Sequence, residues 1–175
     1  MSLSTKHHRS AFSLVEVLLV LTILMLIARQ TWSSSLARWF TQTDYEKLTL
    51  IQRDLARGLM LARQYAIQAN AIIAFCGGDY QEANCDGDWS KGWYIESGSD
   101  IKTFHLFPLD IQVNWSGFPA NKKRIDFYEN GHSGYQNGTF YLCQDELVGK
   151  IILNQSGRFY LTNISELPEL KEQCE

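Results

Sequence analysis

Two clusters of residues have types that could do chemistry. His132 and Ser133 place a general base beside a hydroxyl nucleophile, but they lie between glycines in a turn-rich stretch and lack the Gly-x-Ser-x-Gly pattern of a nucleophile elbow. Asp86 and Asp88 resemble the start of a calcium-binding loop, yet Trp89 occupies the position where that loop requires glycine. We interpret both clusters as turns, and we expect no enzymatic activity, no metal site and no cofactor. A membrane-tethered enzyme is the least favoured class of function.

Four cysteines are the remaining candidates for chemistry, and all of them follow the apolar N-terminal stretch. In a domain exported to oxidising conditions, four cysteines predict two disulfides. A zinc site is disfavoured because the chain contains no Cys-x-x-Cys and because His105 and His132 lie far in sequence from any cysteine pair. Three connectivities are possible. We favour one that closes a short Gly-rich loop and ties the polar C-terminal tail to a strand: Cys76 with Cys85, and Cys143 with Cys174.

A single carboxylate, Glu16, interrupts the most apolar stretch of the chain. Residues 12–28 are apolar at 14 of 17 positions, and a helix of this length spans roughly 25 Å, which is enough for a bilayer. Lys6 and Arg9 precede the stretch, so the positive-inside rule predicts a cytoplasmic N-terminus and an exported C-terminal part. An ionised carboxylate at mid-bilayer costs on the order of 3 kcal/mol, so Glu16 needs a partner.

An amine is the natural partner for this carboxylate. If the chain is cut between Ala11 and Phe12, the new N-terminal amine lies one helical turn from Glu16, and the same amine of a neighbouring subunit could serve instead. Two alternatives are an ordinary signal peptide cleaved after Ser35-Leu36-Ala37 and a plain single-span anchor. The signal peptide is disfavoured because Glu16 lies inside its apolar region and because the helical pattern continues past Ala37 without a break.

A long helix is predicted to carry these residues. No proline or glycine occurs between Phe12 and Arg57, so we expect one continuous helix over residues 12–70, with a transmembrane part at 12–28 and an amphipathic stem at 29–70. Trp32, Trp39 and Phe40 would lie at the membrane interface or against neighbouring subunits. The buried face of the stem is predicted from apolar residues at steps of three and four: Leu48, Ile51, Leu55, Leu59, Ala62, Ala66 and Ala69.

After Asn70 the pattern changes to short β-type runs bounded by Gly, Asn and Asp. Alternation in Lys102–Phe107 predicts a strand with one buried face. We expect an α+β fold in which the second half of the helix packs on antiparallel sheet, with residues 71–175 forming a β-rich domain. The eight predicted strands are residues 71–76, 92–96, 102–107, 111–115, 124–128, 139–143, 148–153 and 158–162.

Charge is distributed unevenly along the chain. Residues 1–11 hold two of the 16 basic residues and none of the 19 acidic ones, so the rest of the chain has a net charge of about -5. An acidic balance gives no general attraction to phosphate backbones. Binding to DNA would therefore need a local basic patch, for which the candidates are Lys122, Lys123, Arg124 and Arg158.

The N-terminal motif resembles a known processing site. Ala11-Phe12-Ser13-Leu14-Val15-Glu16, after a short basic leader at residues 1–11, is similar to the prepilin cleavage site of type IV pilins and type II secretion pseudopilins. The resemblance implies that a membrane peptidase cuts between Ala11 and Phe12 and N-methylates Phe12. This family favours glycine before the cut, where this chain has Ala11.

Motifs in the second half of the chain resemble those of the pseudopilin H and FimT/FimU minor pilin group, with a type IV pilin-like fold. They are Trp89-Ser-Lys-Gly92-Trp93, Arg124-Ile-Asp-Phe-Tyr-Glu-Asn-Gly131 and Ser156-Gly157-Arg158. Gly92 and Gly131 are expected in tight turns, and Trp89 and Trp93 in the core or a loop.

The resemblance implies a structural subunit of a type IV pilus or a type II secretion pseudopilus, located at or near the fibre tip. The implied partners are the prepilin peptidase, the inner-membrane assembly platform, a major pilin and other minor pilins or pseudopilins. The protein would be a single-pass inner-membrane protein, with its C-terminus in the periplasm, before it enters the fibre. The alternative is a minor pilin that binds DNA for uptake; related receptors carry a Gly-Arg-x-Arg motif, of which Gly157-Arg158-Phe159-Tyr160 retains one arginine.

Overall fold

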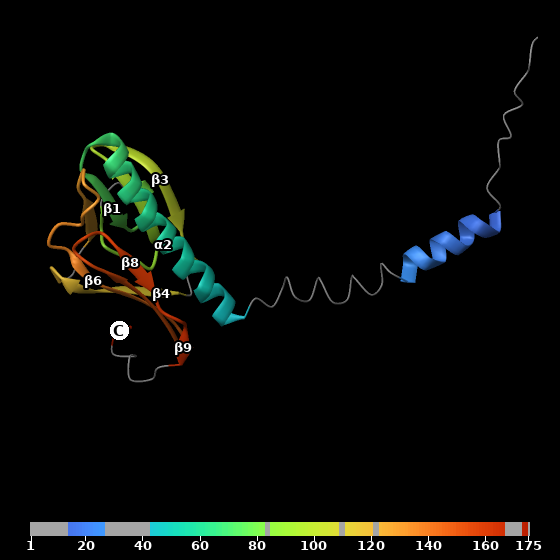
Figure 1. Ribbon diagram of the computed structural model, residues 1–175. Coiled ribbons are helices and arrows are strands. Elements are labelled where there is room, and N and C mark those ends of the chain that lie inside the picture. The colour runs from blue at the N-terminus through green and yellow to red at the C-terminus, as the bar shows by residue number, and fades with distance from the viewer. Residues whose placement is uncertain are drawn as a thin grey trace, which may run out of the picture. The chain divides into compact units, whose positions relative to one another are not determined.

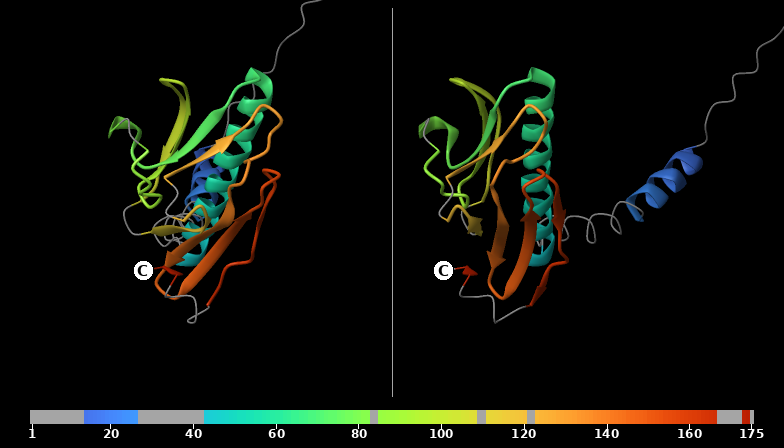
Figure 2. Two further views of the ribbon diagram at one scale, coloured as in Figure 1. Left: turned by 90° about the vertical axis from the view of Figure 1, so that its left-hand side faces the viewer. Right: turned by 60° about the vertical axis from the view of Figure 1, so that its left-hand side comes forward.

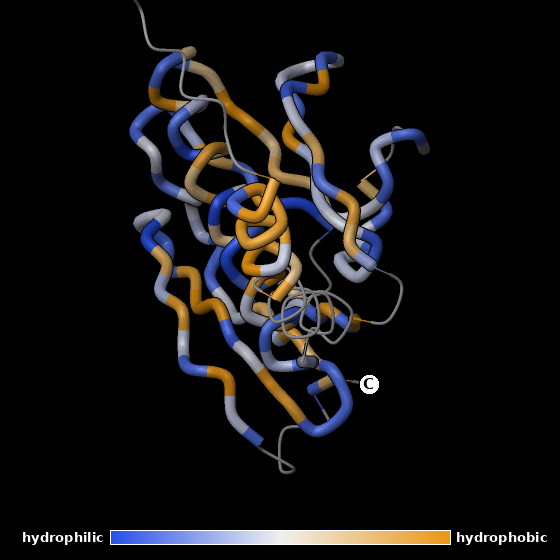
Figure 3. Tube along the Cα trace, turned by 90° about the vertical axis from the view of Figure 1, so that its right-hand side faces the viewer, coloured by the Kyte–Doolittle hydropathy of each residue, from blue (hydrophilic) through white to orange (hydrophobic). Residues whose placement is uncertain are grey.

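The computed structural model describes residues 14–26, 43–82, 85–108, 111–120, 123–166 and 173–174. The chain divides into two units, Met1–Gln42 and Thr43–Glu175. In the first unit, the described residues 14–26 form a helical segment that is mostly hydrophobic in Figure 3. Among the described residues, no helix combines the length and the apolar character that crossing a membrane requires.

The second unit begins with the 26-residue helix α2, Asp44–Ala69. Thr43 is its N-cap: the Thr43 side chain accepts a hydrogen bond from the Glu46 amide, and the Glu46 side chain accepts one from the Thr43 amide. This reciprocal capping box satisfies amides that have no partner inside the helix. Because Thr43 has an extended backbone (φ -65°, ψ 148°), the prediction of one unbroken helix over residues 12–70 is wrong at this position.

Two antiparallel sheets pack against α2 (Figure 1). The four-stranded sheet has the order β3-β2-β1-β5, and the five-stranded sheet has the order β4-β6-β7-β8, with β9 also pairing with β7. The strands are β1 Ile73–Gly77, β2 Gly92–Ser97, β3 Asp100–Leu106, β4 Gln112–Phe118, β5 Arg124–Phe127, β6 Asn137–Gln144, β7 Leu147–Leu153, β8 Phe159–Leu161 and β9 Ser165–Glu166. A short 3-10 helix, η1 Tyr80–Glu82, follows β1.

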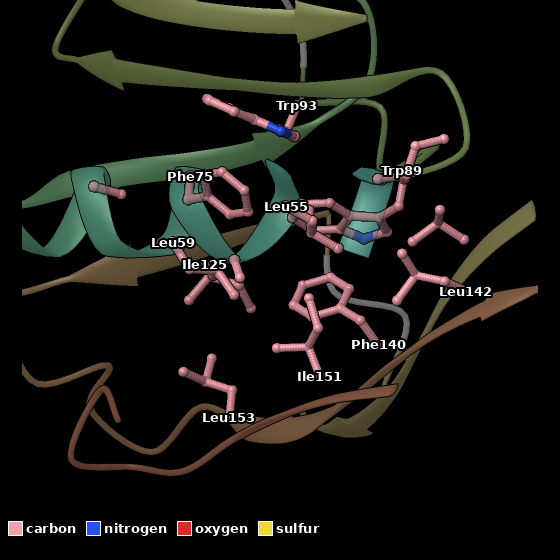
Figure 4. Packing of buried hydrophobic residues seen from close by; sticks show 14 of the residues in the cluster. Leu55, Leu59, Phe75, Trp89, Trp93, Ile125, Phe140, Leu142, Ile151 and Leu153 are labelled. Carbon is pink, nitrogen blue, oxygen red and sulfur yellow. The ribbon is translucent and has the colours of Figure 1, made fainter. Parts of the chain in front are cut away.

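The main hydrophobic core lies between α2 and the two sheets (Figure 4). Leu55 and Leu59 of α2 are fully buried, as are Phe75 on β1 and Phe140 on β6. The predicted buried face of the helix is confirmed at every position except Ala69, which is exposed in the last turn. Trp89 and Trp93 are both buried and flank Phe75, so these tryptophans are core residues.

The predicted α+β fold is confirmed, and each of the eight predicted strands is present with ends shifted by up to three residues. The expectation of a buried face on the third predicted strand is wrong. In β3, six of seven residues are exposed and Thr103 is half-buried. In the four-stranded sheet α2 packs mainly on β1, β2 and β5, whereas β3 lies at the edge beyond β2 and is not covered by the helix.

Candidate assembly surfaces

Glu16 lies within the described helical segment 14–26, and every described residue of this segment is exposed. Apolar side chains point outward all round it; Leu14 is 78% exposed and Leu26 is 67% exposed. A helix that is apolar on all sides needs burial by lipid or by several neighbouring helices. Ala11 and Phe12, the predicted processing site, lie outside the described residues.

The second unit contains two disulfides. Cys76 on β1 is bonded to Cys85, with their Cα atoms 5.1 Å apart, and Cys143 on β6 is bonded to Cys174, with their Cα atoms 6.0 Å apart. This is the connectivity that the sequence favours. Because Cys143 lies within the five-stranded sheet, the second disulfide attaches the end of the chain to the core.

One face of α2 is not covered by either sheet. In the right-hand view of Figure 2, the four-stranded sheet and most of the five-stranded sheet lie on one side of this helix. Three apolar residues on the uncovered face are about half exposed: Leu50 at 52%, Met60 at 44% and Ile67 at 50%. We call the following six exposed residues the outer stripe of α2: Leu50, Arg53, Arg57, Met60, Gln64 and Ile67.

Polar contacts on either side of the outer stripe attach α2 to the sheets. The Gln52 side chain is buried and donates to the carbonyls of Lys150 and Thr162, both at 2.9 Å. Asp54 accepts a hydrogen bond from the Trp93 indole at 2.9 Å and lies 3.4 Å from Nδ1 of His105. These contacts leave the outer stripe as the free face of the helix.

His132 and Ser133 lie in a hydrogen-bonded turn, as the sequence predicts. The Ser133 side chain is fully buried, and its Oγ lies within hydrogen-bond distance of the Gln136 and Asn154 carbonyls, at 2.8 and 2.9 Å. The backbone N–H of His132 donates to the Asn130 side chain. Gln136 then pairs with both backbone groups of Asp126, which gives the outer edge of β5 a side-chain partner and links the two sheets.

The acidic loop before β2 is neutralised by a lysine of the same chain. Lys91 Nζ lies 3.0 Å from Asp86 and 3.8 Å from Asp88. The backbone amides of Asp88 and Ser90 donate to the Asp86 and Asp88 side chains, respectively. The loop is therefore a hydrogen-bonded turn in which an ammonium group already satisfies the two carboxylates.

The four basic residues considered for DNA binding do not form one free patch. Arg124 lies 3.0 Å from Asp126 and 3.6 Å from Glu96, so its charge is offset by two carboxylates. Arg158 comes just before β8 of the other sheet. The nearby Gln155 carbonyl accepts a hydrogen bond from the backbone N–H of Ser133, which follows the far end of β5. The length of β5 alone, about 10 Å, separates these two sites. Lys123 is exposed, and Lys122 lies outside the described residues.

Sequence reasoning missed Gln52, Gln136 and the outer stripe. The two glutamines bond to backbone carbonyls and amides that are 10 to 110 residues away, and nothing in the local pattern marks such partners. The outer stripe left a detectable signal, because Leu50, Met60 and Ile67 are apolar residues that do not share the phase of the buried face.

Comparison with known proteins decides the family. The family described as "Type II transport protein GspH" matches residues 52–157, which is 106 of the 175 residues. This chain belongs to the GspH family of type IV pilin-like proteins. The matched region runs from Gln52 in α2 to the turn before β8, so it contains most of the core, the whole four-stranded sheet and the strands β4, β6 and β7 of the other sheet.

Solved structures support the same fold. Two crystal forms of the type IV minor pilin FimU from Pseudomonas aeruginosa are similar to this GspH-family chain. One is 20% identical, covering 65% of this chain and 91% of FimU with a TM-score of 0.50. The other is 21% identical, covering 70% and 92% with a TM-score of 0.52. No curated protein matches the chain significantly.

Proposed function

We propose that this GspH-family protein is a structural minor pilin or pseudopilin that is cut between Ala11 and Phe12, methylated at Phe12 and assembled at or near the tip of a type IV pilus or type II secretion pseudopilus. The observation that carries the proposal is the exposed apolar helical segment 14–26 in a chain whose second unit belongs to the GspH family. Before assembly, the protein is anchored in the inner membrane by residues 12–28, with its second unit in the periplasm.

Assembly moves the apolar segment from lipid into a bundle of similar helices. Both environments are apolar, so the transfer is not driven by hydrophobic burial, and a specific polar contact is needed to fix the register. Glu16 supplies that contact by pairing with the N-terminal amine of Phe12 in the same or a neighbouring subunit. The prepilin peptidase and the assembly platform are the partners that this route requires.

Intact mass of the protein extracted from membranes tests the processing step. The expected chain starts at Phe12 and carries one added methyl group. A chain that starts after Ala37, or one that is not cut, would overturn the proposal.

The register role of Glu16 has a separate test. Glu16→Ala should still insert in the membrane but should fail to enter sheared fibres. Thr22→Ala is the matched control, because Thr22 is the other polar residue of the described segment and bonds only within its own helix, to the Leu19 carbonyl at 2.8 Å. Normal incorporation of Glu16→Ala would show that the carboxylate has no role in register.

DNA binding is not proposed as a second function. The ion pairs of Arg124 with Asp126 and Glu96 offset the charge of one of the four residues of the predicted patch. The net acidic balance of the chain beyond the leader also opposes phosphate binding.

A further inference from the structure

The outer stripe of α2 has the spacing of a helix-pairing seam. From Leu50 to Ile67, its six members follow one another at intervals of 3, 4, 3, 4 and 3 residues. An average step of 3.5 residues keeps such a seam facing a second helix over several turns. Its composition fits an interface as well, since methionine and arginine are enriched where proteins meet.

The charge of the outer stripe is basic. Arg53 and Arg57 are exposed, and neither guanidinium group forms an ion pair or a hydrogen bond with any other residue in the part of the chain that the structure describes. No acidic residue lies between Leu50 and Ile67 on this face. Two guanidinium groups flanked by half-exposed apolar side chains therefore select a partner that carries carboxylates.

The acidic residues of α2 are already engaged within the protein. Asp44 accepts from Lys47 at 3.1 Å and from the Gln144 side chain at 3.1 Å. Glu46 caps the helix, and Asp54 is held by Trp93 and His105. In a second copy of the chain, each carboxylate of α2 thus already has a partner within its own chain.

The segment before α2 does not supply a carboxylate either. Residues 27–43 contain Arg29 and Arg38 and no acidic residue. Apart from Glu16, which lies in the apolar segment, neither residues 27–43 nor α2 of an identical subunit provides a carboxylate without a partner of its own for Arg53 and Arg57. The charge pattern therefore favours a partner with a different sequence.

We propose that the outer stripe of α2 docks an amphipathic helix of a non-identical subunit of the same fibre, whose seam carries aspartate or glutamate opposite Arg53 and Arg57. Leu50, Met60 and Ile67 supply the apolar contacts, and the two arginines set the choice and the register of the partner. This inference rests on the proposed function, because it requires the protein to enter a fibre with other subunits.

Photo-crosslinking in the full-length chain tests the proposal. The photoreactive residue p-benzoylphenylalanine replaces Met60, the protein is expressed in fibre-forming cells, and crosslinked peptides are identified by mass spectrometry in sheared fibres. The expected product joins Met60 to a helical peptide of another subunit that carries acidic residues at steps of three or four. Arg53→Glu with Arg57→Glu should lower its yield by about tenfold, and replacing the acidic residues of the partner by arginine should restore it.

Two control variants isolate the role of charge. Arg53→Lys with Arg57→Lys keeps both charges and should retain most of the crosslink. Arg158→Glu makes the same change of sign at another exposed arginine and should leave the yield unchanged. Thermal melting of each variant should match that of the original protein, because these side chains are exposed.

The possible outcomes separate the inference from the proposed function. Absence of the original protein from fibres overturns the proposed function and the inference together. Presence in fibres overturns the inference alone if Met60 crosslinks to a second copy of this chain, forms no crosslink, or forms one that the reversal of Arg53 and Arg57 does not change.

Discussion

At the scale of single residues, the amide of Gln52 connects α2 to the five-stranded sheet. It is 4% exposed and donates at 2.9 Å to the carbonyls of Lys150 and Thr162. The backbone N–H of Thr162 also donates to the Lys150 carbonyl, at 3.0 Å. One side chain therefore fixes how the helix lies against β7 and the segment that follows β8.

Replacing this amide should destabilise the second unit. Gln52→Leu removes the buried amide that donates to the Lys150 and Thr162 carbonyls, at a cost of about 1 to 3 kcal/mol, which corresponds to about 3 to 9 °C in melting temperature. Thermal unfolding followed by circular dichroism measures the change. Gln68→Leu is the control, because Gln68 is exposed on the same helix and should change the melting temperature little; an equal effect in the two variants would contradict the role of Gln52.

The hydroxyl of Tyr94, in contrast to the amide of Gln52, is a buried polar group without a hydrogen-bond partner among the described residues. It is fully buried, on the face of the four-stranded sheet that also carries Cys76. Burial raises the pKa of Tyr94 above its ordinary value of 10.0, and the nearby carboxylates of Glu96 and Asp86 raise that pKa further. The phenolic proton of Tyr94 is therefore bound more tightly in the folded protein than in the unfolded chain.

This difference predicts a loss of stability at high pH. Below pH 10, Tyr94 is protonated in both states and its contribution is fully present. As pH rises past 10, the unfolded chain releases the proton while the folded protein retains it, so the free energy of unfolding falls until the raised pKa is passed. Urea unfolding between pH 8 and 11 should show a shallower decline for Tyr94→Phe, and stability at pH 7 should be unchanged or higher because an unpaired buried hydroxyl is removed.

The exposed Tyr135 provides the comparison for this test. Tyr135→Phe, at a position that is 81% exposed, should leave the pH profile unaltered. A profile for Tyr94→Phe that overlays the original protein throughout would show that burial of this phenol does not contribute to the decline.

At the scale of elements, α2 lies so close to the four-stranded sheet that position 58, inside the helix, must be glycine. A Cβ atom on Gly58 would lie 2.7 Å from Cε2 of Phe75 and 2.8 Å from Cε2 of Trp93. Glycine in a helix interior costs about 1 kcal/mol relative to alanine. Glycine at this position lets the two buried rings pack directly against the helix backbone, and this close packing offsets the lower helix propensity.

Gly58→Ala sets these two effects against each other. The gain in helix propensity is about 1 kcal/mol, whereas forcing a methyl group between two buried rings costs typically about 1 to 3 kcal/mol. We expect a net loss of stability in urea unfolding. The double variant Gly58→Ala with Phe75→Leu should recover part of the propensity gain relative to Phe75→Leu alone, and a stabilised Gly58→Ala would disprove the close contact.

Sequence patterns predicted the elements well where burial is periodic, and less well at their ends and edges. The buried face of α2 and all eight main strands follow from apolar spacing. The break at Thr43 was missed, although Thr43 and Glu46 have the spacing of a capping box, because the absence of proline and glycine was given more weight. The exposed β3 was missed because alternation cannot show whether a strand lies at the centre or the edge of a sheet.

The candidate site was less predictable than the fold for a physical reason. A surface that binds another protein needs no fixed sequence spacing. In a single chain, such a surface is marked only by charged side chains without a partner and by exposed apolar side chains. Glu16 could be singled out because a carboxylate in an apolar run is costly in any context. Arg53 and Arg57 stand out only when the structure shows that Asp54, next to them in sequence, is committed to Trp93 and His105.

At the scale of the whole molecule, the two disulfides constrain the chain over different lengths. Cys76 and Cys85 are 9 residues apart, whereas Cys143 and Cys174 are 31 residues apart. The first closes a local loop beside β1, and the second holds the C-terminal end against β6. A disulfide stabilises mainly by restricting the unfolded chain, so the longer loop should contribute more.

Paired alanine substitutions test that order. By the loop-entropy relation, removing the longer link through Cys143→Ala with Cys174→Ala should cost about 3 to 4 kcal/mol, and removing the shorter one through Cys76→Ala with Cys85→Ala about 2 to 3 kcal/mol. Urea unfolding of both variants, with the remaining disulfide of each verified by the absence of thiol labelling, gives the comparison. Cys76 is fully buried and Cys143 nearly so, so the change in side-chain packing acts in the same direction in both. A larger loss for the shorter link would show that packing around β1, rather than restriction of the unfolded chain, dominates its contribution.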